Sequence, residues 1–446
     1  MLSRIPLAPG PGGGASLSGS GPAGASHTGP SRPGPAPAAP ARTGRSRIGS
    51  AGTGSSAGAS GTTVVFSGGG TGGHLYPALA LADALARIRP GLRAVFVGAE
   101  RGIEARVLPQ RGLEHLLLPV EGFRRGELLA NLAVLRALLR ALVRVAALFR
   151  RLRPSLVVVT GGYAGGPAGL MAALLGIRLV LQEQNAEPGV TTRVLSRWAT
   201  ETHLAFPEAA RRLPRAGRSG VQVTGNPVRP PESIDRREAA EHFGLDPDRP
   251  VILAVGGSQG ALPLNRALLE LAEGVAAGAL APLHPAQLLW ATGPTHLDEV
   301  TRALDALGHP AWIRVVGYIE RMPLALGLAD LAVSRAGAMA TSEFLAWGLP
   351  ALLVPLPGAA ADHQTLNARA LEEAGAAQCL LQADLDGTRL HAELQGLLVD
   401  QPLRAAMTHA ARSRGRPDAA HQMALRLDAL LPPPVRREGA GSGGAA

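Results

Sequence analysis

Three glycine-rich segments in this chain each follow a short run of apolar and β-branched residues. They occupy residues 68–74, 161–167 and 256–261. Glycine lets backbone amides approach a diphosphate closely, and a helix that begins after the segment adds partial positive charge at its N-terminus. Glycine also relieves a tight turn between a strand and a helix, which is the structural alternative for any one segment. Three such segments favour a site for two phosphorylated molecules held face to face.

The first segment also matches the GxGxxG pattern of a dinucleotide-binding loop, with Gly68, Gly70 and Gly73. That loop is usually followed by an acidic residue at the end of the second strand, about 20 residues further on. The nearest acid here is Glu100, which lies too far along the chain, so we disfavour a dinucleotide. All 44 basic residues are arginine. The chain therefore lacks the lysine of a GxxxxGK[ST] phosphate loop and any Schiff-base lysine.

An alternation of strands and helices must position these segments. Predicted strands span residues 63–67, 94–98, 116–120, 156–160, 179–182 and 221–224, then 251–255, 288–291, 313–316, 331–333 and 351–354. Predicted helices include residues 77–87, 128–152, 167–175 and 236–243. A proline-rich stretch at residues 226–231 interrupts the alternation. We predict an α/β fold of two doubly wound, Rossmann-like domains, residues 63–228 and 229–431, with ligands at the carboxyl ends of parallel strands.

The composition of the 446 residues supports two folded domains and excludes several classes of function. Apolar residues make up 46% and charged residues 17%, enough to bury two cores. The single cysteine, Cys379, excludes a disulfide framework and a cysteine metal cluster. No uncharged apolar run reaches the ~18–20 residues of a membrane-spanning helix.

The net charge of +10 is concentrated at one end of the chain. Half of it comes from five arginines within residues 1–62, a Gly/Pro/Ala/Arg-rich extension without acidic residues that we predict to be disordered. Residues 432–446 are predicted to form a flexible tail. With 3% aromatic residues and no basic aromatic motif, nucleic acid is not an expected partner.

Six motifs, in this order, resemble those of one enzyme family. They are GGGTGGHLYPALALADAL from residue 68, GGYAGGPAGLMAALLGIRLVLQEQNAEPG from residue 161, VTGNPVR from residue 223, GGSQGA from residue 256, SRAGAMATSEFLAWGLPALLVP from residue 334 and HQTLNA from residue 363. Together they resemble the MurG family, the peptidoglycan N-acetylglucosaminyltransferases that convert lipid I into lipid II. The resemblance implies a GT-B fold with the active site between the two domains. It also implies UDP-N-acetylglucosamine and lipid I as substrates, and no cofactor.

The resemblance places the donor, UDP-N-acetylglucosamine, mainly on the second domain. Ser258 and Gln259 would contact the diphosphate and the sugar, and Ile319 would meet the uracil through its backbone. Glu343 would accept hydrogen bonds from the ribose hydroxyls, and Gln364 would face the transferred sugar. The donor-contacting positions that the resemblance implies are Thr71, Gly72, Gly73, Asn185, Arg229, Ser258, Gln259, Ile319, Ala338, Met339, Ala340, Thr341, Ser342, Glu343 and Gln364.

Several of these positions have a structural alternative. Asn185 is also suited to capping the loop after a strand, and Arg229 to carrying a surface charge between prolines. Glu343 is also suited to the first turn of a helix, where the helix dipole favours an acid. Ala340 stands where the family often has Thr, which removes one hydroxyl contact and leaves backbone contacts in its place.

The reaction that the resemblance implies is an inverting transfer, in which the 4-hydroxyl of N-acetylmuramic acid displaces UDP from the anomeric carbon. This reaction needs a base near the hydroxyl and stabilisation of the departing diphosphate. His74 is the candidate base, since histidine exchanges protons near neutral pH. Glu183 and His363 compete with it, and a half-buried structural histidine is the alternative. Two DxD patterns, at residues 246–248 and 384–386, follow no strand at the expected cleft, so we predict no metal site.

The segment 128–152 is predicted to be an amphipathic helix that rests on a membrane. Leucines at spacings of three and four mark one face, which continues to Phe149, and arginines lie four apart beside it. An arginine near anionic lipid contributes ~1 kcal/mol. An ordinary domain helix with a solvated arginine stripe is the alternative. The expected membrane surface consists of Leu128, Leu132, Leu135, Arg136, Leu139, Arg140 and Arg144.

The polyprenyl acceptor of the family implies a peripheral protein of the cell membrane, on the cytoplasmic side. Two other functions are weighed against this one. A sugar-nucleotide epimerase or an antibiotic-type glycosyltransferase would share the fold, but neither is expected to combine GGYAGGP, EQNAEPG and GNPVR. A non-catalytic nucleotide-sugar sensor is disfavoured because the glycine segments are intact.

Overall fold

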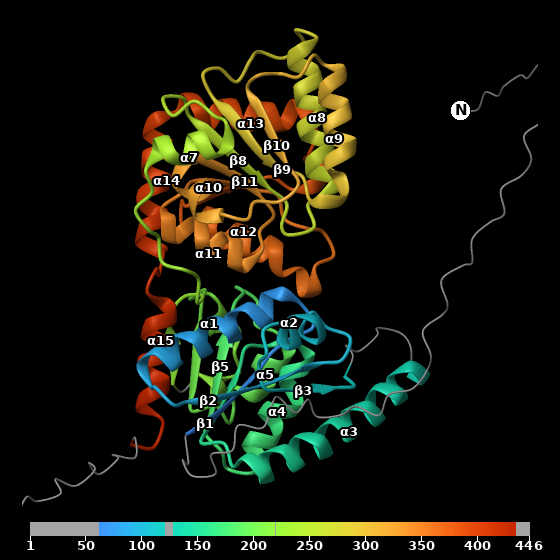
Figure 1. The fold of residues 1–446 in the computed structure, drawn as a ribbon, viewed down its shortest axis with the longest axis vertical. Helices are drawn as coiled ribbons and strands as arrows, with labels where there is room; N and C mark the ends of the chain where they lie inside the picture. The colour runs from blue at the N-terminus through green and yellow to red at the C-terminus, as the bar shows by residue number, and fades with distance from the viewer. Residues whose placement is uncertain (1–61, 121–127, 219, 434–446) are drawn as a thin grey trace, which may run out of the picture. The chain divides into compact units, whose positions relative to one another are not determined.

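The computed structural model describes residues 62–120, 128–218 and 220–433 (Figure 1). The predicted extension of residues 1–62 and the predicted tail of residues 432–446 lie outside the described residues, apart from residues 62, 432 and 433. Within the described ranges, no helix combines the length and apolar character needed to cross a membrane.

The first sheet consists of seven parallel strands in the order β3-β2-β1-β4-β5-β6-β7. Their bounds are β1 Thr63–Ser67, β2 Arg93–Ala99, β3 His115–Leu118, β4 Leu156–Val159, β5 Leu179–Glu183, β6 Glu201–Leu204 and β7 Val221–Val223. In the centre of the sheet, Val65 pairs with Val95 and Val157. All three valines are buried, since helices cover both faces of a doubly wound sheet.

The second sheet has six parallel strands in the order β10-β9-β8-β11-β12-β13. Their bounds are β8 Val251–Val255, β9 Gln287–Ala291, β10 Ile313–Val316, β11 Leu331–Ser334, β12 Ala351–Leu353 and β13 Ala377–Cys379. In both sheets the order of strands reverses beside the first strand, β1 or β8. Ligands of open α/β sheets bind at such a point, outside the carboxyl ends of the strands. The predicted α/β fold class is confirmed.

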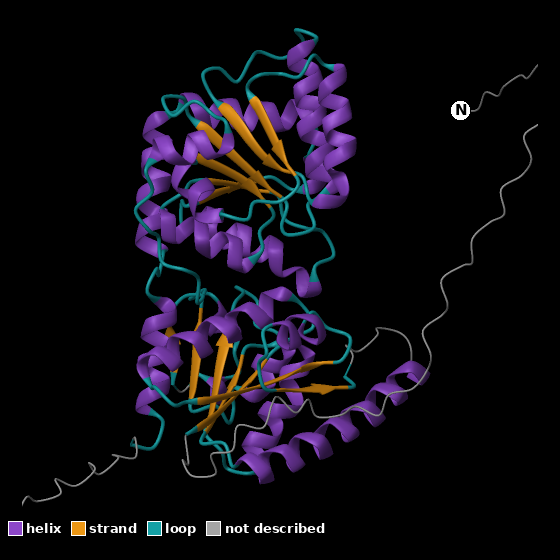
Figure 2. Ribbon diagram, viewed as in Figure 1, coloured by secondary structure: helices purple, strands orange, loops and turns teal. Residues whose placement is uncertain are grey.

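Helices connect the strands and flank each sheet (Figure 2). Those of the first domain are α1 Gly72–Ile88, α2 Glu104–Gln110, α3 Leu128–Leu152, α4 Gly162–Leu174, α5 Val190–Leu195 and α6 Ala209–Arg212. Those that follow are α7 Arg236–Phe243, α8 Leu262–Ala276, α9 Leu297–Ala306, α10 Met322–Leu328, α11 Ala338–Trp347, α12 His363–Glu373, α13 Gly387–Val399, α14 Gln401–Arg414 and α15 Ala419–Ala429.

The last helix, α15, packs against α1 and not against the second sheet (Figure 1). Met423 and Leu427 are buried in the same core cluster as Leu85 of α1. This packing departs from the predicted division, in which residues 229–431 form the second domain. We assign α15 to the first domain, so the chain crosses between the domains twice.

The two crossings touch each other. Gly225 lies on the outgoing crossing and has a φ of 90°, a conformation that favours glycine. A Cβ atom at Gly225 would lie 2.5 Å from the Cβ of Arg416, on the returning crossing. No side chain fits at this position without moving the backbone.

The second glycine segment, residues 161–167, was predicted to be a loop, and this is wrong for most of its length. Helix α4 begins at Gly162 and includes the rest of the segment. The glycines allow the helix to lie close to its neighbours: a Cβ at Gly165 would lie 2.7 Å from Val159, and one at Gly169 would lie 2.3 Å from Leu195. Close helix packing, rather than an extended loop, explains this part of the pattern.

Candidate active site

The segments after β1 and β4 meet at the carboxyl edge of the first sheet. Gly161 and Gly162 have φ values of 94° and 71°, which only glycine adopts readily. A Cβ at Gly162 would lie 2.0 Å from the carbonyl oxygen of Gly69. A Cβ at Gly161 would lie 3.0 Å from Nδ1 of His74. These glycines therefore allow the first segment and the imidazole ring to lie against the backbone at the start of α4.

His74 lies in the first turn of α1 and is half-buried. Its Nδ1 atom lies 3.0 Å from the carbonyl oxygen of Thr160 and 2.8 Å from Oε1 of Gln184. The Thr160 hydroxyl donates a hydrogen bond of 2.7 Å to the backbone carbonyl of His74. The ring is thus held from the ends of β4 and β5. Thr71 and Gly73 beside it are exposed, and Gly72 is half-buried.

The two competing bases have other surroundings. Glu183 is 3% exposed, and its carboxylate accepts hydrogen bonds from the backbone amides of Asn185 (3.1 Å) and Gly189 (3.0 Å) and from the hydroxyl of Thr192 (2.6 Å). These bonds fix the turn that leads into α5. His363 begins α12 of the second domain, and its Nδ1 donates to the backbone carbonyl of Ala360, 2.8 Å away. The carboxylate of Glu183 is thus occupied by this turn, whereas His363, like His74, bonds a backbone carbonyl through Nδ1 and stays a competing base.

Two asparagines that the sequence analysis did not single out join the domains. Nδ2 of Asn367, on α12, donates to Oδ1 of Asn185 at 3.1 Å, and Oδ1 of Asn367 accepts from the amide of Ala186 at 2.9 Å. Nδ2 of Asn226, after β7, donates to the carbonyl of Ala338 at 3.2 Å and to Oγ of Ser342 at 2.9 Å. The carboxyl edges of the two sheets therefore face each other. Asn226 lies in the VTGNPVR motif and Asn367 in the HQTLNA motif. These motifs were the signal in the sequence from which both residues could have been found.

The start of α11 holds the six consecutive donor-contacting positions that were predicted. Ala338 and Thr341 are buried, and the Thr341 hydroxyl donates to the carbonyls of Gly337 and Ala338, both at 3.1 Å. The hydroxyl oxygen of Ser342 accepts from Asn226. The side chains of Thr341 and Ser342 are thus occupied by protein partners. Met339, Ala340 and Glu343 are partly exposed.

Arg229, on the outgoing crossing between the domains, interacts electrostatically with Glu343 of α11. Burial raises the pKa of the Glu343 carboxyl to about 7, and the positive charge of Arg229 opposes this rise. Ionisation of the Glu343 carboxyl therefore costs free energy in the absence of a ligand. Hydroxyl donors from a bound ribose would stabilise the charged form.

The remaining predicted donor positions surround the same edge. Ser258 and Gln259 are exposed in the loop between β8 and α8, and Ile319 is buried in the segment after β10. Oε1 of Gln364 accepts a hydrogen bond of 3.0 Å from the amide of Leu356, in the loop after β12. The positions thus lie on the loops that follow β8 and β10, and on α12.

A buried carboxylate under the first glycine segment was missed. Glu104, in the first turn of α2, is 0% exposed and accepts a hydrogen bond from the amide of Gly70. Its other oxygen has no hydrogen-bond partner among the described residues. Burial raises its pKa, and the bond from Gly70 opposes that rise. The sequence analysis considered Glu100 in this region because it examined only the expected dinucleotide spacing.

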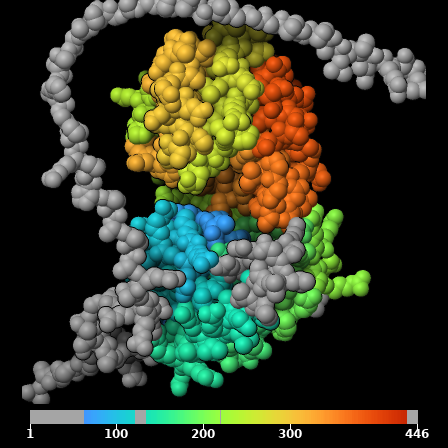
Figure 3. Space-filling view, turned by 90° about the vertical axis from the view of Figure 1, so that its right-hand side faces the viewer, coloured from blue at the N-terminus to red at the C-terminus, as the bar shows by residue number. Residues whose placement is uncertain are grey.

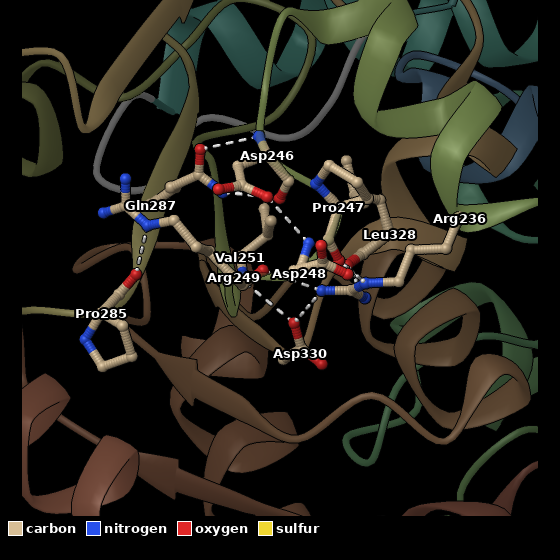
Figure 4. A network of polar contacts seen from close by, with 10 residues as sticks. All are labelled: Arg236, Asp246, Pro247, Asp248, Arg249, Val251, Pro285, Gln287, Leu328 and Asp330. Atoms are coloured by element: carbon tan, nitrogen blue, oxygen red, sulfur yellow. Dashed lines mark hydrogen bonds and ion pairs between the residues drawn. The ribbon is translucent and has the colours of Figure 1, made fainter.

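The first DxD pattern, at residues 246–248, lies before β8 and so at the amino end of the second sheet (Figure 4). The amide of Asp246 donates to Oε1 of Gln287 at 2.9 Å, and the amide of Asp248 donates to Oδ1 of Asp246 at 3.0 Å. Arg236 donates to the carbonyl of Pro247 and to Asp330 nearby. This network closes a turn at the edge of the sheet opposite the glycine segments. Among the described residues, no three His, Cys, Asp or Glu side chains gather as a metal site requires.

Comparison with known proteins gives the family. The family models for the glycosyltransferase family 28 N-terminal domain and C-terminal domain match residues 64–204 and 251–423. A curated relative from Prosthecochloris aestuarii is 42% identical over 371 residues, covering 82% of this chain and 98% of the relative. One from Moorella thermoacetica is 44% identical over 363 residues, covering 80% and 95%. Both are named UDP-N-acetylglucosamine–N-acetylmuramyl-(pentapeptide) pyrophosphoryl-undecaprenol N-acetylglucosamine transferase.

A solved structure agrees with the sequence matches. The crystal structure of Acinetobacter baumannii MurG superposes with a TM-score of 0.67 at 30% identity, covering 82% of this chain and 99% of that one. The resemblance stated from the motifs is confirmed. This chain belongs to the MurG family of glycosyltransferases and carries both family 28 domains in order.

Proposed function

We propose that this chain transfers N-acetylglucosamine from UDP-N-acetylglucosamine to the 4-hydroxyl of N-acetylmuramic acid in lipid I, which yields lipid II for peptidoglycan synthesis. The observation that carries the proposal is identity of 42–44% to transferases of that name over nearly their whole length. The site agrees with it, because a histidine from one domain and two helix N-termini from the other lie on facing sheet edges.

In the proposed reaction, His74 removes the proton from the attacking hydroxyl. The anomeric carbon then inverts as the bond to the diphosphate breaks. Negative charge that develops on UDP meets the backbone amides of residues 256–261 and the N-termini of α8 and α11. Arg229 adds a positive charge beside Glu343. The chain therefore stabilises the leaving group with amides and arginine, because it contains no lysine.

The proposal is tested by incubating the full chain with UDP-N-acetylglucosamine and synthetic lipid I, with and without EDTA. We expect UDP release that requires lipid I and a product heavier by one N-acetylglucosamine. UDP release without an acceptor would instead indicate hydrolysis or epimerisation. UDP binding without turnover would indicate a sensor.

We further propose that α3 rests on the cytoplasmic leaflet of the cell membrane, where the polyprenyl acceptor is held. Leu135, Leu139 and Val143 are 50%, 62% and 68% exposed and lie four residues apart on one side of the helix. The exposed Arg136 and Arg140 flank them. Figure 3 shows the teal residues of α3 at the molecular surface. Three exposed aliphatic side chains beside two cations match an interfacial helix.

The predicted apolar face of this helix needs correction at its second half. Phe149 is 2% exposed and packs on the first sheet together with Val145, so this end of the predicted stripe faces the core. Arg144 forms an ion pair of 2.8 Å with Glu100, which ties it to the domain. The side chains of Leu128 and Leu132 lie outside the described residues. The proposed membrane surface is therefore centred on residues 135–143.

Replacing Arg136 and Arg140 with Gln should reduce co-sedimentation with anionic vesicles, because two exposed charges near the lipid are lost while helix propensity is kept. The loss should be largest at low salt, since the attraction extends over roughly a Debye length of ~8–10 Å at physiological salt. Turnover of membrane-embedded lipid I should fall, and turnover of a short-chain soluble acceptor should stay near wild type.

The matched control replaces the exposed Arg266 and Arg302, on α8 and α9 of the second domain, with Gln. It removes the same charge from the protein and should leave vesicle binding unchanged. If both double variants bind vesicles equally, α3 is an ordinary solvated helix.

A further inference from the structure

A chain of buried side-chain amides runs from His74 to helix α11. Nε2 of Gln184 donates to Oε1 of Gln182, and Nε2 of Gln182 donates to Oδ1 of Asn226 at 2.9 Å. Nδ2 of Asn226 then donates to Ser342 and to the carbonyl of Ala338 at the start of α11. The three amides are 1–2% exposed. Oε1 of Gln184 closes the chain on Nδ1 of His74, at 2.8 Å.

Backbone carbonyls fix the direction of this chain at two points. The NH₂ group of Gln184 faces the carbonyls of Thr160 (2.8 Å) and Gln182 (3.1 Å). The NH₂ group of Asn226 faces the carbonyls of Gln184 and Ala338, both at 3.2 Å. A carbonyl can only accept a hydrogen bond, so neither amide can be turned over without placing oxygen against oxygen. Gln182 lies between them and can satisfy both neighbours in one orientation only.

The carbonyl of Thr160 and, through this direction, Oε1 of Gln184 together determine which nitrogen of His74 carries the proton. Both partners of Nδ1, the carbonyl of Thr160 and Oε1 of Gln184, are acceptors. Nδ1 must therefore be the N–H donor, and the neutral ring has its lone pair on Nε2. We propose that Gln184, Gln182 and Asn226 are positioning residues that hold His74 in the tautomer able to accept a proton at Nε2. This assignment rests on the proposed role of His74 as the base.

The arrangement also prepares the ring for the charge it acquires. When Nε2 takes the proton of the acceptor hydroxyl, the imidazolium donates more strongly through Nδ1, and the aligned amide dipoles stabilise it. In hydrolases with a Ser-His-Asp or Cys-His-Asn site, an aspartate or an asparagine orients the histidine in this way. Here the nearby carboxylate, Glu183, is bonded to Gly189 and Thr192 instead. The orienting group is therefore neutral and needs no buried charge.

The first test reads the tautomer directly. In the full chain labelled with ¹⁵N-histidine, long-range ¹H–¹⁵N correlations at mildly alkaline pH should show His74 with a protonated Nδ1 and an unprotonated Nε2. The chain has 12 histidines, and the signals of His74 are identified as those that disappear in His74→Ala. A protonated Nε2 in the wild-type protein overturns the proposal, whatever the variants show.

The second test is kinetic and compares Gln184→Met, Gln182→Met and the double variant. Each single variant should lower kcat by ~10–100-fold, the range for removing an outer hydrogen-bond partner of a functional histidine. The KM for UDP-N-acetylglucosamine should stay within about twofold, since the side chain of neither glutamine bonds directly to a donor position. Because the links act in series, the double variant should be no slower than Gln184→Met. Independent, multiplicative losses would contradict a chain.

Gln287→Met is the matched control. Gln287 is 3% exposed and bonds to the backbone of Asp246 at the opposite edge of the second sheet (Figure 4). It should lose thermal stability comparably, yet keep kcat and the His74 spectrum. If it loses kcat as much as Gln184→Met does, the effect reflects stability and the proposal fails.

The two proposals fail separately. Full turnover in His74→Ala would remove the base while leaving the measured tautomer in place. A protonated Nε2 in a protein that still makes lipid II would remove the positioning chain while leaving the transferase.

Discussion

Turnover in His74→Ala should fall by ~10²–10⁴-fold, with UDP affinity nearly unchanged, which is the pattern for loss of acid–base catalysis alone. His74 lies on α1 of the first domain, whereas the donor positions lie mainly on the second. Removing the ring therefore deletes a proton acceptor without deleting a donor contact. Steady-state kinetics with lipid I and calorimetry with UDP give the two numbers separately.

His363→Ala is the informative comparison for this prediction. It removes the competing histidine at the start of α12, which contacts the loop at Ala360. We expect a much smaller loss of kcat. If His363→Ala is the slower of the two variants, the base lies on the second domain and the proposed mechanism is wrong.

Glu343→Ala should weaken UDP binding by roughly 1–3 kcal/mol, the range for losing hydrogen bonds to a charged group. UDP affinity should also depend on pH, because burial raises the pKa of Glu343 to about 7. In the role proposed for Glu343, the carboxylate accepts hydrogen bonds from the ribose hydroxyls, so the ionised form is the one expected to bind UDP. Affinity should therefore be full above about pH 7 and fall as the carboxyl is protonated below it.

Two variants separate this dependence from the titration of UDP itself. Glu343→Gln cannot titrate, so the difference between its pH profile and that of the wild type belongs to the carboxyl. Arg229→Gln removes the charge that opposes the rise in pKa, so the midpoint should move to higher pH. If calorimetry gives the wild type and Glu343→Gln the same Kd for UDP at every pH, the carboxyl of Glu343 does not bind the ribose.

The fold was predictable where strands are apolar and buried on both faces. Strands β1, β8 and β10 have the predicted bounds. Strand β6, Glu-Thr-His-Leu, was missed because its sequence is polar. Its buried His203 has a pKa lowered by desolvation to about 4, and Glu201 is bonded to Arg426 of α15. Glu201 is paired by a helix more than 200 residues away, which no local pattern reveals.

The candidate site was predictable where one residue type has one plausible task. The glycine segments and His74 could be named from the sequence because they follow predicted strands, and their roles in the site stay predictions. Asn226 and Asn367 bond to partners in the other domain, which the sequence does not reveal. In the VTGNPVR motif, the sequence analysis therefore selected the charged Arg229 and not Asn226. The same limit applies to Glu104, whose partner is the amide of Gly70.

The return of α15 to the first domain restricts how the enzyme can move. Two domains joined by one linker can rotate about each other in any direction. Two domains joined by adjacent linkers are restricted mainly to rotation about an axis through those linkers. Gly225 and Arg416 lie where the two crossings come together, so such a rotation would pivot near them. Exchange of spent UDP for fresh donor would then open the side of the molecule farthest from residues 225 and 416. Because no side chain fits at Gly225 without moving the backbone, a bulky residue there should disturb both crossings and with them this rotation.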